Sequence, residues 1–194
     1  MTEVELKARL ASPAETEERV KRFARFVRQV DKSDQYWHGP DWRSSPGTRG
    51  FRLRHDGDRC IVTFKTKRLD AGIETNTETE FEVSAPDAFN ALVARIGCEP
   101  YYTKRKTGTM WEYDGCTIEL VTIEPIGHFI EIESLVDSDA PDVLALERDR
   151  ILSVLGLAGV PASAMEARTY SEMLLGAAHW RAGSGPGADP GTST

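Results

Sequence analysis

Charged side chains of like sign recur at every second position in several short segments of this sequence. Carboxylate oxygens are the ligands that Mg²⁺ and Mn²⁺ prefer, and Arg and Lys bind phosphate oxygens. These residue types in this pattern point to a polyphosphate substrate held together with divalent cations. The acidic sets are Glu3 with Glu5, Glu78 with Glu80, and Glu131 with Glu133; the basic sets are Arg52 with Arg54, Lys65 with Lys67, and Lys104 with Lys106.

A spacing of two residues predicts β-strands, because successive side chains of a strand point to opposite faces. Residues 3–10 alternate strictly between charged and apolar side chains. Asp56-Gly57-Asp58 and Asp114-Gly115 are typical of hairpin turns, so we expect mostly antiparallel pairing. Further strands are expected over residues 51–55, 59–67, 74–83, 101–107, 110–113, 117–122 and 128–136.

Helices are expected between these strands, which makes the fold class α+β. Ser12, Pro13 and Glu15 form a capping-box pattern, and the helix they open is expected to carry an apolar stripe as far as Val30. A second helix is expected from Ser84 to Gly97, a third over residues 141–156 and a short one over 170–175, with a loop over 36–50. The two stripes are Val20, Phe23, Val27 and Val30, and Phe89, Leu92, Val93 and Ile96.

Two interpretations of the charged strand faces are open. Antiparallel sheets often keep one face in water, so the charges could simply be solvated. The charges are, however, segregated by sign, and the helices could cover the apolar face. A curled sheet would then enclose its polar face, where bound metal ions and phosphates relieve the repulsion between like charges.

Length and composition restrict the other possibilities. The 194 residues suffice for one domain, expected over residues 1–180, followed by a disordered tail over 181–194. The net charge of −7 argues against a nucleic-acid partner. No apolar run approaches the roughly 20 residues that span a bilayer. The charged start is unlike a signal peptide, and three widely spaced cysteines favour free thiols in a reducing cytoplasm.

The ordered set of motifs resembles the CYTH superfamily, named for class IV adenylate cyclases and thiamine triphosphatases. Glu3-x-Glu5-x-Lys7 matches its ExExK signature, and residues 168–174 resemble the terminal segment of the class IV cyclase branch. The other matching segments are 51–54, 63–65, 78–80, 104–106 and 127–133. The resemblance implies a triphosphate tunnel, which is a closed antiparallel β-barrel of about eight strands flanked by helices.

The resemblance also implies roles for individual residues. It implies Mg²⁺ or Mn²⁺ as cofactor and a small-molecule triphosphate, such as ATP, as substrate. The chain departs from the family where relatives have Asp (here Val121, with Glu119 as a substitute) and Arg (here Asn76). The implied metal carriers are Glu3, Glu5, Glu119, Glu131 and Glu133; the implied triphosphate-binding residues are Lys7, Arg9, Arg52, Arg54, Lys65, Lys104 and Lys106, of which Lys7, Arg54 and Lys65 are also implied in catalysis.

The sequence thus favours a metal-dependent enzyme, either a cyclase that forms cyclic AMP and pyrophosphate or a triphosphate hydrolase. The alternative is a non-catalytic module that binds a nucleotide or polyphosphate, since the basic positions match the family better than the acidic ones. A homodimer is compatible with the sequence, and no nucleic-acid or membrane partner is expected.

Overall fold

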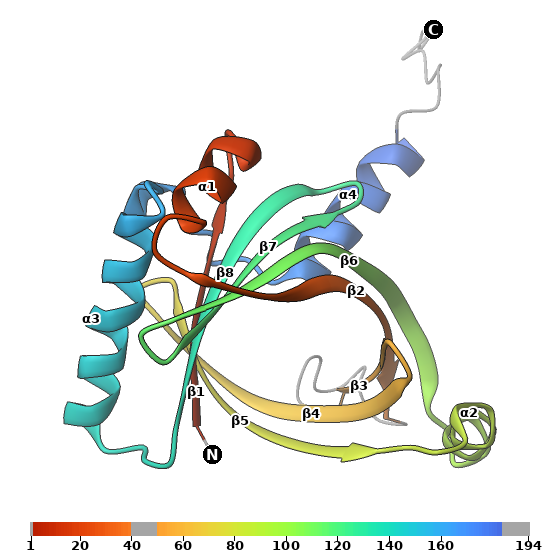
Figure 1. Cartoon of the computed structure of the whole chain (residues 1–194). Coiled ribbons are helices and arrows are strands. Elements are labelled where there is room, and N and C mark those ends of the chain that lie inside the picture. The colour runs from red at the N-terminus through yellow and green to blue at the C-terminus, as the bar shows by residue number, and fades with distance from the viewer. Residues whose placement is uncertain (1, 40–49, 184–194) are drawn as a thin grey trace, which may run out of the picture.

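Eight antiparallel strands form a closed barrel in the computed structural model, which describes residues 2–39 and 50–183 (Figure 1). The order around the barrel is β1-β5-β4-β3-β2-β6-β7-β8. This confirms the predicted fold. The strands are β1 (Thr2–Arg9), β2 (Arg25–His38), β3 (Gly50–Asp56), β4 (Arg59–Asp70), β5 (Ile73–Glu82), β6 (Glu99–Tyr113), β7 (Cys116–Ile123) and β8 (Gly127–Val136).

The first strand closes the barrel. It pairs with β5 on one side and with β8 on the other, so that Glu5 lies opposite Glu74 in one ladder and opposite Glu133 in the other. Closure removes the unpaired strand edges that an open sheet would expose. Because side chains alternate, the charged residues of β1 point into the barrel while Val4 and Leu6 point outward.

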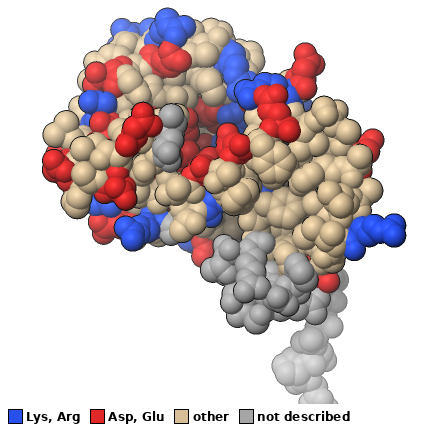
Figure 2. Space-filling view, turned by 90° about the horizontal axis from the view of Figure 1, so that it is seen from below, with Lys and Arg blue, Asp and Glu red and all other residues tan. Residues whose placement is uncertain are grey.

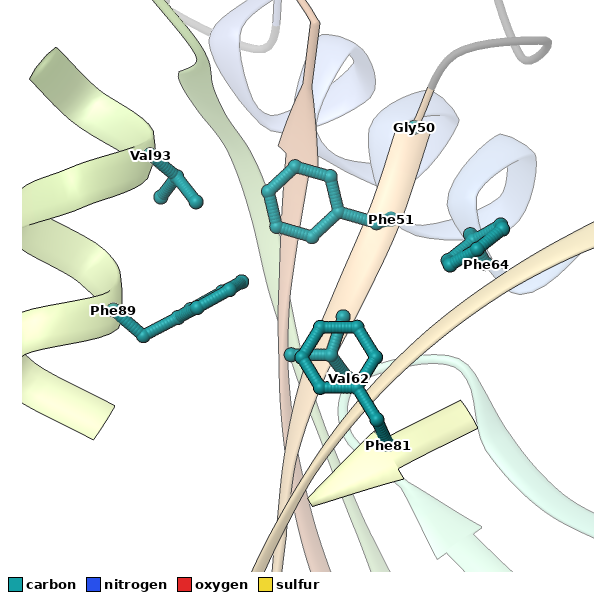
Figure 3. A pocket seen from close by; sticks show the side chains of 7 residues that line it. All are labelled: Gly50, Phe51, Val62, Phe64, Phe81, Phe89 and Val93. Atoms are coloured by element: carbon teal, nitrogen blue, oxygen red, sulfur yellow. The ribbon is translucent and has the colours of Figure 1, made fainter. Parts of the chain in front are cut away.

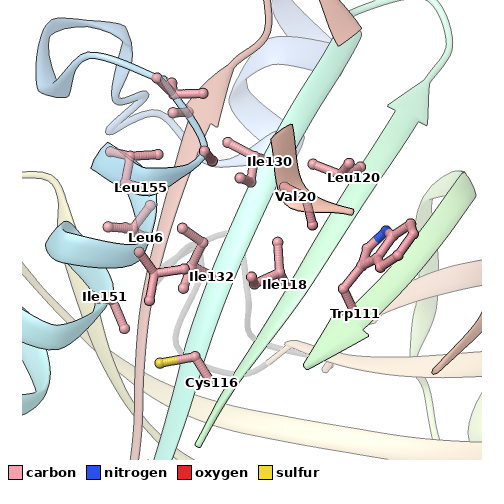
Figure 4. Packing of buried hydrophobic residues seen from close by; sticks show 14 of the residues in the cluster. Leu6, Val20, Trp111, Cys116, Ile118, Leu120, Ile130, Ile132, Ile151 and Leu155 are labelled. Atoms are coloured by element: carbon pink, nitrogen blue, oxygen red, sulfur yellow. The ribbon is translucent and has the colours of Figure 1, made fainter. Parts of the chain in front are cut away.

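Helices cover part of the outer face. They are α1 (Pro13–Val20), α2 (Pro86–Arg95), α3 (Pro141–Leu157) and α4 (Tyr170–Gly183), with a 3₁₀ turn, η2 (Ala162–Ala164). The largest core lies between α1, α3 and the outer faces of β1, β7 and β8 (Figure 4). Leu6, Ile132, Ile151 and Leu155 are almost completely buried there. Each such side chain contributes about 1.5–3 kcal/mol by leaving water.

The second helix packs on the opposite side of the barrel. Phe89 meets Phe81 edge-on at 6.3 Å, and Val93 is buried. Leu92 and Ile96 remain exposed, so the apolar stripe predicted for this helix is only half covered. Between α2 and strands β3–β5 lies an apolar pocket lined mainly by phenylalanines (Figure 3).

The helix predicted to run to Val30 is wrong beyond Val20. Pro13 does open α1, although the Ser12 side chain makes no capping hydrogen bond. The chain then enters β2 at Arg25. Over residues 31–34 both faces of this strand are polar, with Lys32 and Asp34 buried and Asp31 and Ser33 exposed, so it lacks the apolar alternation by which strands are predicted. The loop predicted from residue 36 is likewise wrong for residues 36–38, which belong to β2.

One long strand, β6, replaces the two strands predicted over 101–107 and 110–113. It continues through Gly108, where β6 and β7 approach so closely that a Cβ atom would lie 1.9 Å from the Leu120 carbonyl oxygen. Glycine therefore permits a close strand contact here and does not end the strand.

The C-terminal helix extends further than predicted. It runs to Gly183, so residues 181–183 of the predicted tail are helical, whereas residues 184–194 lie outside the described residues. Residues 40–49 of the loop predicted over 36–50 also lie outside them. Across the described part of the chain, no helix combines the length and apolar character required to span a membrane.

Leu6→Ala should lower the free energy of unfolding by about 2–5 kcal/mol, because it leaves a cavity in the largest core. Urea denaturation monitored by circular dichroism measures this. Leu146→Ala is the matched control, because Leu146 lies on α3 but is 64% exposed. This variant should change the free energy of unfolding by no more than about 0.5 kcal/mol. Equal losses in the two variants would contradict the assigned packing.

Candidate functional site

Two walls of opposite charge face each other inside the barrel. Four neighbouring strands, β5, β1, β8 and β7, carry most of the inward carboxylates, and the other four, β4, β3, β2 and β6, carry most of the inward cations. In the view from below, acidic side chains surround a hollow in the surface of the molecule (Figure 2). The acidic wall consists of Glu74, Glu78, Glu3, Glu5, Glu131, Glu133 and Glu119, and the basic wall of Lys65, Arg52, Arg54, Lys32, Lys104 and Lys106.

Lys65 bridges the two walls at the edge of the acidic one. Its ammonium nitrogen lies 2.7 Å from Glu78, 3.4 Å from Glu3 and 3.8 Å from Glu5, measured to carboxylate oxygens. The register explains this, because Lys65 is directly opposite Glu78 and β5 separates it from β1. Asn76, which is fully buried, donates a hydrogen bond of 2.8 Å to Glu3.

The acidic wall carries more negative charge than this lysine neutralises. Burial and the neighbouring Glu5 carboxylate raise the pKa of Glu3 to about 8. The same two causes raise the pKa of Glu133 to about 7. Both carboxyls would therefore release their protons more readily beside an additional cation.

The donor atoms of this wall suit Mg²⁺ or Mn²⁺. Glu3, Glu5 and Glu133 supply hard carboxylate oxygens, which these ions prefer. The buried amide oxygen of Asn76 has no hydrogen-bond partner among the described residues, which leaves it free to accept from a metal-bound water. The residues present therefore fit a divalent cation, and Asn76 replaces the expected arginine with a neutral oxygen donor.

The basic wall is organised around a single buried carboxylate, that of Asp34. Asp34 lies directly opposite Arg54 on β3 and opposite Lys104 on β6. It accepts two hydrogen bonds from Arg54, of 2.7 and 2.9 Å, and lies 3.2 Å from the Lys104 ammonium. Burial would raise the pKa of Asp34, but Lys104 and Arg54 outweigh it and lower that pKa. Asp34 thus holds two cations in fixed positions facing the interior.

A phenol completes this part of the wall. Lys104 donates a hydrogen bond of 3.2 Å to the Tyr36 hydroxyl. Burial acts to raise the pKa of Tyr36, but the Lys104 charge outweighs it and lowers the pKa to about 8. The Tyr36 ring stacks on Tyr102 at 4.2 Å. A phenol with this pKa can accept a proton near neutral pH.

Two carboxylates predicted to carry metal are already paired with lysines. Lys106 contacts Glu131 and lies 3.4 Å from Glu119, which also contacts Lys32. Burial would raise the pKa of Glu131, but Lys106 and Lys104 lower it. Glu119 and Glu131 thus lie inside the tunnel. There they form ion pairs with lysines and do not form a cluster made of carboxylates alone.

The first turn of α4 closes one end of the tunnel. The Tyr170 ring lies 4.8 Å from the Lys104 ammonium, 5.7 Å from that of Lys7 and 5.8 Å from that of Lys106. Beyond it is an apolar cluster of Val30, Val121, Ile123, Phe129 and Met173. Val121 is therefore buried in an apolar cluster at this end of the barrel.

Comparison with known proteins agrees with this architecture. The sequence model of the family described as the CYTH domain matches residues 1–170 of this chain. The chain belongs to the CYTH family. A Methanocaldococcus jannaschii protein named "Putative adenylate cyclase MJ0240" is 23% identical over 159 residues, which are 81% of this chain and 91% of that protein.

Solved structures show the same fold. Protein PH1819 of Pyrococcus horikoshii OT3 is 28% identical, with a TM-score of 0.76 over 90% of this chain and 99% of that one. A Hippeastrum protein, whose structure is described as revealing a dominant triphosphatase activity, is 18% identical, with a TM-score of 0.61 over 93% of this chain and 96% of that one.

The remaining residues predicted from the CYTH motifs lie in different surroundings. Lys7 lies inside the tunnel, 3.3 Å from a carboxylate of β5. Arg52 lies on the basic wall and donates to a threonine of β4 at 2.9 Å. Arg9 lies at the closed end, where it pairs with Glu166 at 3.0 Å and fixes the segment that leads to α4. Arg105, which alternates with Lys104 and Lys106 along β6, faces outward and pairs with Asp31.

Prediction from the CYTH motifs missed three inward residues of β2: Lys32, Asp34 and Tyr36. Their spacing of two residues is typical of a strand. It was not used, because a helix was predicted before these residues and a loop was predicted from residue 36. Glu74, which pairs with Lys7, was also missed as a site residue.

Asp34→Asn should lower the free energy of unfolding by about 3–5 kcal/mol, because it leaves two buried cations without their counter-ion. Because the folded-state pKa of Asp34 is lowered, its contribution is present above about pH 4 and is lost as the pH falls. Urea denaturation at pH 7 and at about pH 2 measures both effects.

Asp31→Asn is the control, since Asp31 pairs with Arg105 on the exposed outer face, and it should change stability little. The free energies of unfolding of wild type and Asp34→Asn should become more similar at low pH. An equally large difference at both pH values would contradict the ion-pair assignment.

Proposed function

We propose that this protein is a metal-dependent enzyme that cyclises or hydrolyses a triphosphate inside its tunnel. The observation that carries the proposal is the pair of opposed walls: carboxylates suited to a divalent cation face cations suited to phosphate oxygens across one enclosed space. Membership of the CYTH family supports it. The names of the Methanocaldococcus and Hippeastrum proteins favour adenylate cyclase and triphosphatase activity.

The basic wall would bind and orient the phosphate chain. Arg54 presents a planar fork to phosphate oxygens, and Lys104 and Lys106 act as point charges. Asp34 keeps Arg54 and Lys104 in place before substrate binds, so they need little reorganisation when charge develops on the phosphate. A Mg²⁺ or Mn²⁺ ion held by Glu3, Glu5 and Glu133 would neutralise phosphate charge and polarise the phosphorus–oxygen bond.

Tyr36 is the candidate proton acceptor. With Lys104 lowering its pKa to about 8, a fraction of Tyr36 is phenolate at neutral pH. In hydrolysis its oxygen would take a proton from the water as that water attacks the terminal phosphorus and the diphosphate leaves. In cyclisation it would take the proton of the ribose 3′-hydroxyl as the 3′-oxygen attacks the α-phosphorus and pyrophosphate leaves. The same residue thus serves either reaction.

A non-catalytic binding module is the less favoured alternative. It would need only the basic wall, whereas the acidic wall keeps three inward carboxylates, Glu3, Glu5 and Glu133, at a cost in repulsion that a metal ion relieves.

Glu5→Ala should lower kcat/KM for the triphosphate at least about 100-fold, because it removes a metal ligand. Incubation with ATP or tripolyphosphate and Mn²⁺, followed by chromatography, measures turnover. Cyclic AMP with pyrophosphate identifies a cyclase, and orthophosphate identifies a hydrolase. Glu18→Ala, on the exposed face of α1 where Glu18 pairs with Lys21, should retain wild-type activity. Tight binding without any product from the wild type would establish the binding module instead.

Tyr36→Phe should lower kcat by about 10²–10⁴-fold, in keeping with loss of a general base. The wild-type rate should rise with pH up to about 8 as the phenol ionises, and the variant should lose this rise. Tyr113→Phe is the control, because Tyr113 packs against Phe23 outside the barrel. An unchanged pH profile in Tyr36→Phe would remove Tyr36 from the reaction.

A further inference from the structure

The Lys65 ammonium stands where the carboxylates of the acidic wall meet. Glu3, Glu5 and Glu78 approach it from β1 and β5, with oxygen–nitrogen distances of 2.7–3.8 Å. The cation at the centre of this group is therefore part of the protein itself.

One ammonium does not balance the group. Three carboxylates surround Lys65, and Glu133 lies directly opposite Glu5 in the adjoining ladder. Like charges at such distances repel strongly where water is scarce.

The carboxylates are not yet arranged as a metal site. Within the described residues, no three His, Cys, Asp or Glu side chains are close enough together to hold a metal ion. The position of Lys65 explains this, because the carboxylates gather around its ammonium instead of converging on an empty point.

Asn76 gives an independent indication that a ligand belongs here. Its amide nitrogen donates to Glu3, and none of the residues that the structure describes donates a hydrogen bond to its buried amide oxygen. A buried oxygen left in this state costs free energy unless a donor or a cation reaches it. The oxygen therefore marks a place for a ligand beside Glu3.

We propose that Lys65 is a resident counter-ion of the metal site, and that a divalent cation must displace its ammonium from Glu3, Glu5 and Glu78 in order to bind. This inference rests on the proposed function, because it presumes that the acidic wall binds a metal. It gives Lys65 an effect of opposite sign on the two ligands: it opposes the metal while it attracts the triphosphate.

Isothermal titration of the full-length protein with MnCl₂ alone tests this, because no substrate or turnover is involved. Lys65→Met keeps the length of the side chain and removes its charge, so it should bind Mn²⁺ at least about tenfold more tightly than wild type. Lys104→Met removes a charge from the opposite wall, where the partner is Asp34, and should change the affinity less than about threefold.

An affinity of Lys65→Met for Mn²⁺ equal to or weaker than that of wild type would overturn the inference, as would an equal gain in Lys104→Met. If Lys65→Met does not fold, Lys65→Arg decides. The arginine fork grips carboxylates more firmly, so Mn²⁺ should bind at least about threefold more weakly, and unchanged or tighter binding would overturn the inference.

The proposed function fails in a different way. If wild type and all three variants bind no Mn²⁺, the metal site itself is absent. If wild type binds Mn²⁺ and Lys65→Met binds it no better, the metal site stands and only the role of Lys65 is wrong.

Discussion

Closure of the barrel is the constraint on which the rest of this structure depends. When a sheet with a charged face closes on itself, those charges lose most of their water and can be neutralised only by one another or by a ligand. The strand order places carboxylate-bearing strands on one side and cation-bearing strands on the other. Most of the inward charges pair as this constraint requires, and Asp34 with Arg54 is the best-ordered example.

The acidic wall near β1 is the exception. Across the adjoining strands β5, β1 and β8, Glu74, Glu5 and Glu133 lie in one row. Lys7 pairs with the first of them, while Lys65 is shared among several carboxylates. The free energy that this repulsion costs is offset by the cores on the outer face, where the same strands present apolar side chains to α1 and α3. Function and stability thus occupy opposite faces of the same strands.

Much of this was predictable from the residues. The alternation of Glu3, Glu5 and Lys7 with apolar neighbours predicts β1 and its inward charges, and tight turns predict the antiparallel order, both of which the structure confirms. β2 was not predicted, because its outward residues Asp31 and Ser33 are polar as well as its inward residues Lys32 and Asp34. Prediction by apolar alternation fails wherever both faces of a strand are polar.

The contacts within the site depend on which strands become neighbours, and one strand alone does not reveal that. Lys65 belongs to a basic strand, yet β4 lies beside β5, so its ammonium reaches the carboxylates of the opposite set. Likewise, the sequence shows only that valine stands at position 121 where an aspartate was expected. The structure shows that Val121 packs in an apolar cluster with Met173 of α4. Such roles follow from the closed barrel and not from local sequence.

The central claim is that the two walls enclose one site for a metal ion and a triphosphate. A crystal structure with Mn²⁺ and a non-hydrolysable triphosphate analogue tests it most directly, because anomalous scattering locates the manganese. We expect a manganese peak inside the barrel beside Glu3 and Glu5, with the phosphates against Arg54 and Lys104. Manganese or phosphate bound only on the outer surface, with the tunnel unchanged, would contradict the account.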